Sequence, residues 1–126
     1  MTVTLPETLQ YGKVVGRFLL AVGDTTADPD NLPDAEAALG SIVFSPVVPI
    51  TKELSADPPV LVSRQPVPAK IDSSGFLVDL NDAPGVWLIT GDWRVNYTLS
   101  GVALPTKTIT ITTAHTDLAP FDLINA

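Results

Sequence analysis

The sequence lacks cysteine entirely, which excludes disulfides and thiolate metal sites and leaves the redox compartment undetermined. Basic residues are also few: seven lysines and arginines stand against fourteen aspartates and glutamates, giving a formal net charge of -7. This balance argues against nucleic acid and anionic membrane surfaces as partners, because both require a basic footprint. No apolar run approaches the roughly 18 residues of a membrane helix, and the first residues lack the basic and long apolar regions of a signal peptide. We therefore expect a protein that is soluble as it is made.

Residues with catalytic chemistry are scarce. The chain has one histidine, His115, and neither a Gly-x-Ser-x-Gly nucleophile motif nor a phosphate-binding Gly-rich loop accompanies it. A single histidine without cysteines cannot form the usual zinc site. The fourteen acidic residues would allow a pair of catalytic carboxylates on paper, but no spacing singles out such a pair. We predict no catalytic residue and no cofactor, and a small hydrolase in which His115 is essential remains as a rival hypothesis.

Acidic side chains gather in one expected loop, residues 23–40. Five of the fourteen acids lie there, and clustered carboxylates are the ligands that calcium prefers. Their spacing does not match an EF-hand loop, and aspartate and asparagine are also ordinary residues of turns and helix caps. A plain loop is therefore the favoured interpretation, and the weak metal-ligand candidates are Asp24, Asp28, Asp30 and Asp34.

Twelve prolines and eight glycines, spread along the chain, leave no long window for a helix. The best helical candidate is Asp34–Leu39, which would make about one and a half turns before Gly40. Short apolar segments separated by turn signals instead predict an all-β fold, a single antiparallel β-sandwich of about seven to nine strands with extended termini. We divide the chain into an N-terminal arm at residues 1–10, a sandwich domain at 11–113 and a C-terminal docking tail at 114–126.

The centre of this fold is expected around the two tryptophans, Trp87 and Trp93. Val86–Thr90 is an apolar run suited to a strand covered on both faces, and Trp93–Leu99 alternates apolar and polar residues with the period of a half-buried strand. Gly91-Asp92 between them predicts a tight turn, so we expect a hairpin with both tryptophans in the core. Further strands are expected at 41–46 and 107–113, and a second hairpin at 67–71 and 75–80.

Two segments carry more apolar surface than one small body needs. Tyr11–Val22 is apolar on both faces, so we expect this strand in the centre of a sheet or under a neighbouring subunit. Gly16 within it suggests a bulge or a close backbone approach. The apolar residues of the tail predict docking on its own body or on a neighbour. The candidate interface residues are Tyr11, Val15, Arg17, Leu19, Phe121, Leu123 and Ile124.

An ordered set of short motifs runs through the chain. These are Gly12–Leu19 as an opening strand, Asp28–Asp34 as an acidic loop, Gly40–Pro46, Pro66–Leu77 and Gly85–Leu88. In this order, over about residues 12–113, the set resembles a β-rich domain of minor tail proteins from tailed phages that infect actinobacteria, found on tail-tip and fibre components. Each motif is common in β proteins, and the ordered set is more specific than any member.

The resemblance implies a non-enzymatic structural protein of the virion tail, made in the host cytoplasm. Its β-sandwich would act as an adaptor that joins the tail tip or baseplate to fibre or receptor-binding parts. The partners implied are other copies of the chain, as a trimer or hexamer, other tail proteins and a host-surface glycan; no catalytic residue is implied. The alternative from another class is a carbohydrate-binding β-sandwich that recognises a host-surface receptor, in which exposed tryptophans would stack on sugars.

Overall fold

The computed structural model describes residues 9–23, 32, 34–54 and 57–125, and in these ranges the protein is all-β with several antiparallel sheets. The described residues contain no α-helix. They contain one short 3-10 helix, η1, at Leu123–Asn125. They contain twelve strands, more than expected, because the chain also forms two small separate hairpins and two strands of two residues each. The strands are β1 Tyr11–Val15, β2 Leu19–Val22, β3 Asp34–Ala37, β4 Gly40–Pro46, β5 Ile50–Glu53, β6 Val60–Ser63, β7 Val67–Ile71, β8 Leu77–Val78, β9 Val86–Ile89, β10 Gly91–Leu99, β11 Lys107–Ile111 and β12 Phe121–Asp122.

A five-stranded antiparallel sheet in the order β11-β10-β4-β7-β8 forms one layer of the body. Its longest strand, β10, pairs with β4 over seven residues and with β11 over five. The alternation expected in β10 is confirmed, because Trp93 and Val95 are buried while Arg94 between them is exposed. In β11 the alternation is also confirmed, with Ile109 and Ile111 buried and the threonines turned outward.

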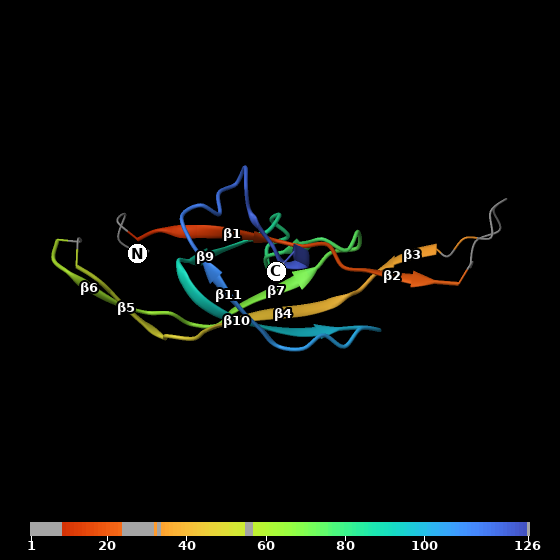
Figure 1. The fold of residues 1–126 in the computed structure, drawn as a ribbon, viewed down its shortest axis with the longest axis horizontal. Coiled ribbons are helices and arrows are strands. Elements are labelled where there is room, and N and C mark those ends of the chain that lie inside the picture. Colours follow the sequence, from red (N-terminus) through yellow and green to blue (C-terminus); the bar gives the residue numbers. More distant parts are fainter. Residues whose placement is uncertain (1–8, 24–31, 33, 55–56, 126) are drawn as a thin grey trace.

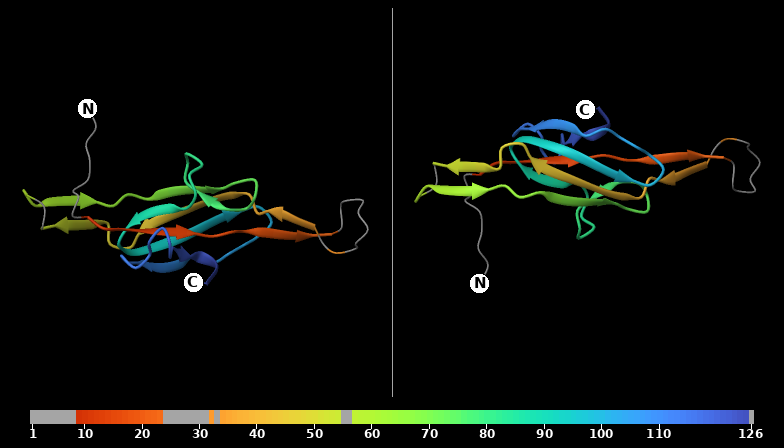
Figure 2. Two further views of the ribbon diagram at one scale, coloured as in Figure 1. Left: turned by 90° about the horizontal axis from the view of Figure 1, so that it is seen from above. Right: turned by 90° about the horizontal axis from the view of Figure 1, so that it is seen from below.

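A three-stranded sheet in the order β12-β1-β9 forms the facing layer (Figures 1 and 2). Strand β1 runs antiparallel to β9 and parallel to β12. Its inner residue Val14 joins Val86 and Leu88 of β9 in one core cluster with Phe44 and Trp93 of the larger sheet. Burial of these side chains between the layers is the main source of stability for the body.

The expected hairpin between the two tryptophan-bearing strands was wrong. Strands β9 and β10 follow one another in sequence but belong to different sheets. Gly91 makes the corner with a φ of 138°, and a side-chain carbon there would collide with Arg64 Nη1. The Trp93 indole nitrogen donates a hydrogen bond to the Ile89 carbonyl, 2.8 Å away. The chain therefore crosses from one layer to the other where the sequence predicted a hairpin within one sheet.

The long strand expected at Tyr11–Val22 is divided at Gly16. Strand β1 ends at Val15, and Arg17 forms a single bridge with Phe76 before β2 begins. Gly16 is buried, and a carbon placed on it would lie 3.0 Å from the Phe18 ring, so the close approach expected at this glycine is confirmed. The division lets the first part of the segment join the body and the second part leave it.

The helix expected at Asp34–Leu39 was also wrong. Asp34–Ala37 forms β3, which pairs antiparallel with β2 from Leu19↔Ala37 to Val22↔Asp34. A helix of one and a half turns is marginal in water because nucleation fixes several residues for one hydrogen bond. Pairing with a neighbouring strand satisfies the same backbone groups and overrides the modest helical preference of alanine and glutamate.

The second expected hairpin is confirmed in β7 and β8, although β8 is shorter than expected. Its turn is held by Asp72, whose carboxylate oxygen accepts hydrogen bonds from the backbone nitrogens of Ser74 at 2.8 Å and Phe76 at 2.9 Å. This is the local arrangement that makes aspartate favourable at the start of a turn.

Two hairpins project from opposite ends of the long axis of the molecule (Figure 1). We call β2 with β3 the acidic-end arm, and β5 with β6 the proline-end arm. Among the residues that the structure describes, each hairpin pairs only within itself, as a two-stranded sheet. The molecule is therefore a two-layer body with an arm at each end.

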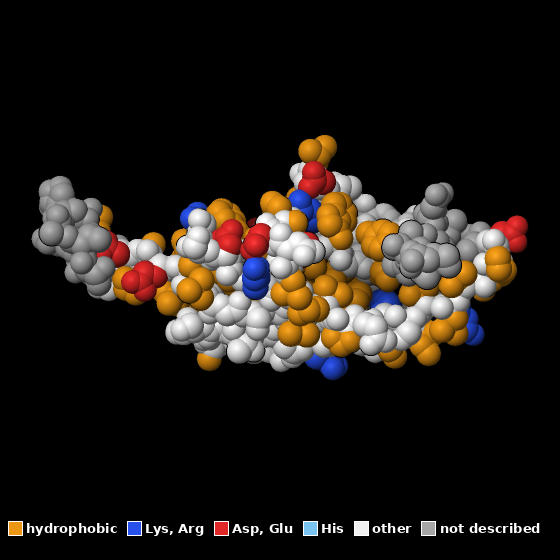
Figure 3. Space-filling model, turned by 180° about the vertical axis from the view of Figure 1, so that it is seen from behind, with side chains coloured by type: hydrophobic (Ala, Val, Ile, Leu, Met, Phe, Trp, Pro, Cys, Tyr) orange, Lys and Arg blue, Asp and Glu red, His pale blue; other side chains and the backbone are white. Residues whose placement is uncertain are grey.

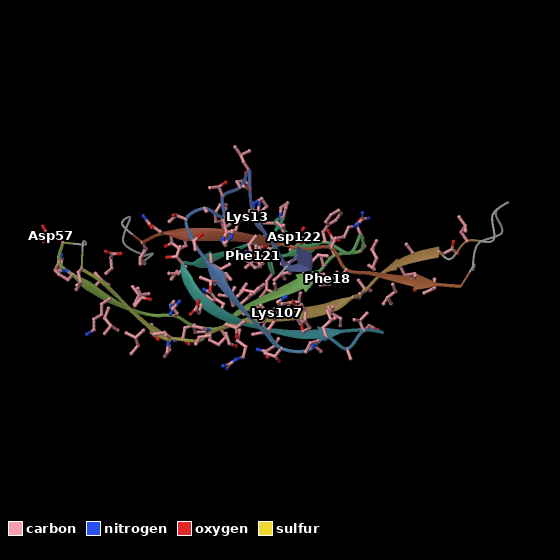
Figure 4. All side chains as sticks on the ribbon, in the orientation of Figure 1. Lys13, Phe18, Asp57, Lys107, Phe121 and Asp122 are labelled. Atoms are coloured by element: carbon pink, nitrogen blue, oxygen red, sulfur yellow. The ribbon has the colours of Figure 1, made fainter. Side chains whose placement is uncertain are left out.

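The C-terminal segment docks on the body of its own chain. The Lys13 backbone nitrogen donates a hydrogen bond to the His115 carbonyl at 2.9 Å, and β12 adds to β1 through Val14↔Phe121. Leu123 is only 5% exposed and lies in the core cluster. Figure 4 shows Phe121 and Asp122 near Lys13 over the body. Of the two docking partners that the sequence left open, the structure shows the chain's own body.

Candidate functional site

The acidic-end arm presents one wholly apolar face. The pairing register places Leu19 and Ala21 of β2 on the same side as Ala35 and Ala37 of β3. Leu19 is 45% exposed, and Ala21 and Ala35 are exposed as well. The opposite face carries Glu36. A flat face of small apolar side chains suits contact with another protein surface better than contact with water.

The proline-end arm also exposes large apolar side chains. Ile50 and Leu61 share one face of this hairpin and are 49% and 60% exposed, and Leu54 at its turn is 74% exposed. In Figure 3 hydrophobic side chains recur at the surface toward this end of the molecule. A two-stranded hairpin is marginally stable by itself, so exposed apolar residues here indicate a surface that a partner would cover.

Three of the candidate interface residues, Val15, Arg17 and Ile124, meet around a hollow of about 390 Å³ in the side of the body. The Arg17 guanidinium lies 4.6 Å from the centre of the Phe76 ring, and its Nε donates a hydrogen bond to the Ser74 carbonyl at 3.2 Å. A stacked and hydrogen-bonded arginine at the surface is held in one position, which favours it as a contact residue.

The other candidate interface residues are placed differently. Tyr11 lies at the far end of β1 and is 38% exposed, while Leu19 belongs to the acidic-end arm. Phe121 is half-buried against the core, and Leu123 is inside it. The structure therefore uses Leu123 within the fold instead of at a surface between subunits.

A second hollow, of about 310 Å³, opens between the free edge of β9 and the segment from Val62 to Val67. We call it the Trp87 hollow, because the Trp87 side chain is half exposed on its wall. The expectation that both tryptophans lie in the core is confirmed for Trp93, which is 1% exposed, and was wrong for Trp87, which is 50% exposed. The reason is the alternation within β9: Val86 and Leu88 face the core, so Trp87 between them lies on the outer face of the smaller sheet.

Arg64 lies against this hollow and was missed by sequence reasoning. Its side chain is only 6% exposed. Among the residues that the structure describes, Arg64 is the one charged residue that is buried. Nη2 donates to the Val48 carbonyl, and the guanidinium carbon lies 5.5 Å from the centre of the Trp93 ring. The flanking residues Ser63 and Gln65 are exposed and polar, so the sequence offers no signal that this arginine is turned inward.

A third hollow of about 280 Å³ lies beside Phe18, Tyr97 and Lys107. The Tyr97 ring meets the Phe18 ring edge-on, with 6.0 Å between centres. Burial raises the pKa of Tyr97, because the phenolate would lose solvation there. Figure 4 shows Phe18 and Lys107 in this part of the body.

His115 has contacts that explain it structurally. Its Nδ1 accepts a hydrogen bond from the Thr112 backbone nitrogen at 3.1 Å, and its ring meets the Phe121 ring edge-on at 5.0 Å. Nearby, Lys13 Nζ and Asp117 Oδ1 form an ion pair at 2.6 Å. The Lys13–Asp117 ion pair fastens the C-terminal segment to β1, and the side-chain contacts of His115 hold that segment together internally.

Three of the weak metal candidates, Asp24, Asp28 and Asp30, lie outside the described residues. Asp34 begins β3. Within the described part of the chain, no three histidine or acidic side chains gather closely enough to hold a metal ion. The same residues include no helix with the length and apolar character needed to cross a membrane.

Comparisons of the chain with models of known protein families, with curated protein sequences and with solved structures give no match.

Proposed function

We propose that this protein is a non-enzymatic structural component of a phage virion. In this proposal its two facing sheets form a β-sandwich adaptor in the minor tail or baseplate, between the tail tip and fibre or receptor-binding parts. The ordered motifs that resemble minor tail proteins support the virion setting. The observation that carries the structural role is the pair of arms, because both expose apolar side chains that the rest of the described chain leaves uncovered.

The positions of the arms favour contact between copies of the chain. They lie at opposite ends of the long axis, so an arm of one copy reaches a different surface on the next. Such a head-to-tail contact is heterologous and closes into a ring when the rotation between copies divides a full turn. We propose a ring of three or six copies, which then contacts other tail proteins.

The oligomeric part of the proposal is tested by analytical ultracentrifugation of the full chain across micromolar concentrations. We expect a trimer or hexamer that Ala21→Glu dissociates, because a charge would be placed on the apolar face of the acidic-end arm. Ala114→Glu is the matched control, since Ala114 is exposed in a turn beyond β11. A monomer at every concentration, or equal effects of the two variants, would refute assembly through this arm.

The virion setting is tested by immunogold labelling of intact particles from the source lysate with antibody against the chain. Label at the distal end of the tail supports the adaptor role. Unlabelled particles with free protein in the lysate would refute it and favour the second candidate.

The second candidate function is carbohydrate binding at a host surface. One specific observation favours it: Trp87 is half exposed beside a hollow, where an indole face could stack on a sugar ring. Trp93 is buried and serves as an internal reference in fluorescence. Acrylamide quenching of Trp87 should decrease when a bound glycan covers it; unchanged quenching across a glycan panel would remove this candidate.

A further inference from the structure

The buried guanidinium of Arg64 is incompletely satisfied. Nη2 has the Val48 carbonyl as its acceptor, but Nε and Nη1 are buried and have no hydrogen-bond partner in the described part of the chain. A buried charge without hydrogen-bond partners costs free energy of folding. Native proteins rarely retain one unless an ion, a water molecule or a ligand pairs with it. The neighbouring Trp93 ring offers only partial compensation through its face.

The hollow beside Arg64 has the composition of a saccharide site. Tyr11 and Trp87 lie on the same outer face of the smaller sheet, because the register pairs Tyr11 with Ile89 and Lys13 with Trp87. Both aromatic side chains are substantially exposed. On the opposite wall Gln65 Nε2 donates a hydrogen bond to Ser63 Oγ at 2.9 Å, which places an amide and a hydroxyl where sugar hydroxyls could reach them.

We propose that the Trp87 hollow binds a saccharide that carries a carboxylate, such as a uronic acid residue. The sugar ring lies against Trp87 and Tyr11, and its carboxylate accepts hydrogen bonds from Arg64. This inference rests on the carbohydrate-binding candidate and is independent of assembly through the arms. The carboxylate is specified because Arg64 carries two buried nitrogens without a hydrogen-bond partner, which a neutral sugar would leave without a counter-charge.

Size and charge around the hollow agree with this ligand. A volume of about 310 Å³ is at the small end of ligand sites, which suits one or two sugar residues. Lys13 Nζ lies 5.9 Å from the centre of the Trp87 ring and adds local positive charge, although its ion pair with Asp117 reduces it. The net charge of -7 acts at longer range, where salt at physiological strength screens it beyond about 8 Å.

Binding requires the Arg64 side chain to move. Nε and Nη1 have almost no exposed surface, and Nη1 packs against Gly91. The guanidinium must therefore turn from Gly91 toward the hollow when the carboxylate arrives. The guanidinium nitrogens that lacked a partner then donate charge-assisted hydrogen bonds to the carboxylate. Such bonds are stronger than those to a neutral hydroxymethyl group, so the acidic sugar binds more tightly.

The test is ligand-observed NMR and tryptophan fluorescence titration of the full chain with methyl glucuronide and methyl galacturonide. Methyl glucoside and methyl galactoside are the matched neutral probes. We expect saturable binding of the acidic sugars and about ten- to hundredfold weaker binding of the neutral ones, as a hydrogen bond to a charged group implies. Arg64→Gln should remove this preference, and Trp87→Ala should weaken binding of every sugar.

Phe76→Ala is the control, because Phe76 is an exposed aromatic outside this hollow and its loss should leave binding unchanged. Trp93 emission and the thermal midpoint report whether each variant is folded. Equal binding of acidic and neutral sugars would overturn the role of Arg64 while carbohydrate binding stands. Absence of binding by all four sugars at millimolar concentration would overturn both, and would leave the adaptor proposal untouched.

Discussion

The body and the arms are built from the same element, an antiparallel pair of strands, but only the body has a second layer. In the body Ile42, Phe44 and Val95 are 0% exposed, because side chains from the smaller sheet cover them. In the arms Leu19 and Leu61, residues of the same apolar class, are 45% and 60% exposed. What a strand contributes therefore depends on what lies across its face. The body has a second layer over its inner face, whereas the arms bury a few side chains, such as Val62, and leave Leu19 and Leu61 exposed.

The largest expected difference between these regions is in amide hydrogen exchange. Amides of β4 and β10 should exchange only through global unfolding, whose free energy is about 5–15 kcal/mol for a domain. Amides of the two arms should exchange by local opening at a small fraction of that free energy, since each arm is a two-stranded sheet with exposed apolar residues such as Leu19 and Leu61. Hydrogen exchange monitored by mass spectrometry, at protein concentrations where the chain is monomeric, measures the exchange of the body strands and of the arms. Arms as protected as β10 under those conditions would remove the distinction.

Matched truncations of apolar side chains should show the next largest contrast. Phe44→Ala should lower the free energy of unfolding by about 3–5 kcal/mol, because it empties a fully buried site. Leu61→Ala in the proline-end arm should change it by less than about 0.5 kcal/mol. Urea unfolding of the monomer gives both values. A cost for Leu61→Ala as large as that for Phe44→Ala would show that the arm is packed against the body.

Alanine variants of two adjacent residues test whether the C-terminal tail is part of the folded body. Leu123→Ala should cost about 2–5 kcal/mol, since Leu123 is 5% exposed within the core cluster. Ile124→Ala should cost much less because Ile124 is 57% exposed. Thermal unfolding of the two variants distinguishes them. Equal, small costs would mean that the tail contributes little to the body and is free to contact a neighbour.

The smallest expected effect is the pH dependence of the body. The raised pKa of Tyr97 means that the unfolded chain loses this proton first, so stability falls as pH rises above the ordinary tyrosine pKa of about 10. Tyr97→Phe keeps the ring and should reduce that fall. Tyr11→Phe, at an exposed position, serves as the control. Thermal midpoints from about pH 9 to pH 11 provide the measurement, and identical slopes in the two variants would contradict the assignment.

Much of the larger sheet could be predicted from the sequence, because its strands carry strong local signals. The alternation in β10 and β11 identifies which side chains face inward, and Asp72 marks the turn between β7 and β8. Such patterns give the face that each residue uses. They do not identify which strand it pairs with, because pairing depends on residues distant in the sequence.

That limit explains the errors. Gly91-Asp92 has the local chemistry of a tight turn, yet β9 and β10 have different partners, which no local pattern reveals. The alanines of β3 favour a helix locally, and pairing with β2 overrides them. The burial of Arg64 depends on its contacts with Gly91 and Trp93, which are distant in sequence, so it could not be predicted without the sheet topology. The exposure of Trp87 follows from its place between Val86 and Leu88, which face the core.

The parallel pairing of Val14 with Phe121 has a consequence for the order of folding. Strand β1 is made early, but one of its partners is β9 and the other is almost the last part of the described chain to be synthesised. Contacts so distant in sequence close slowly, and proteins rich in them fold in milliseconds to seconds. The larger sheet needs only β4, β7, β8, β10 and β11, so it can assemble first. The smaller sheet then closes over it, and a nascent chain that has not yet released residue 121 would still have an open edge on β1.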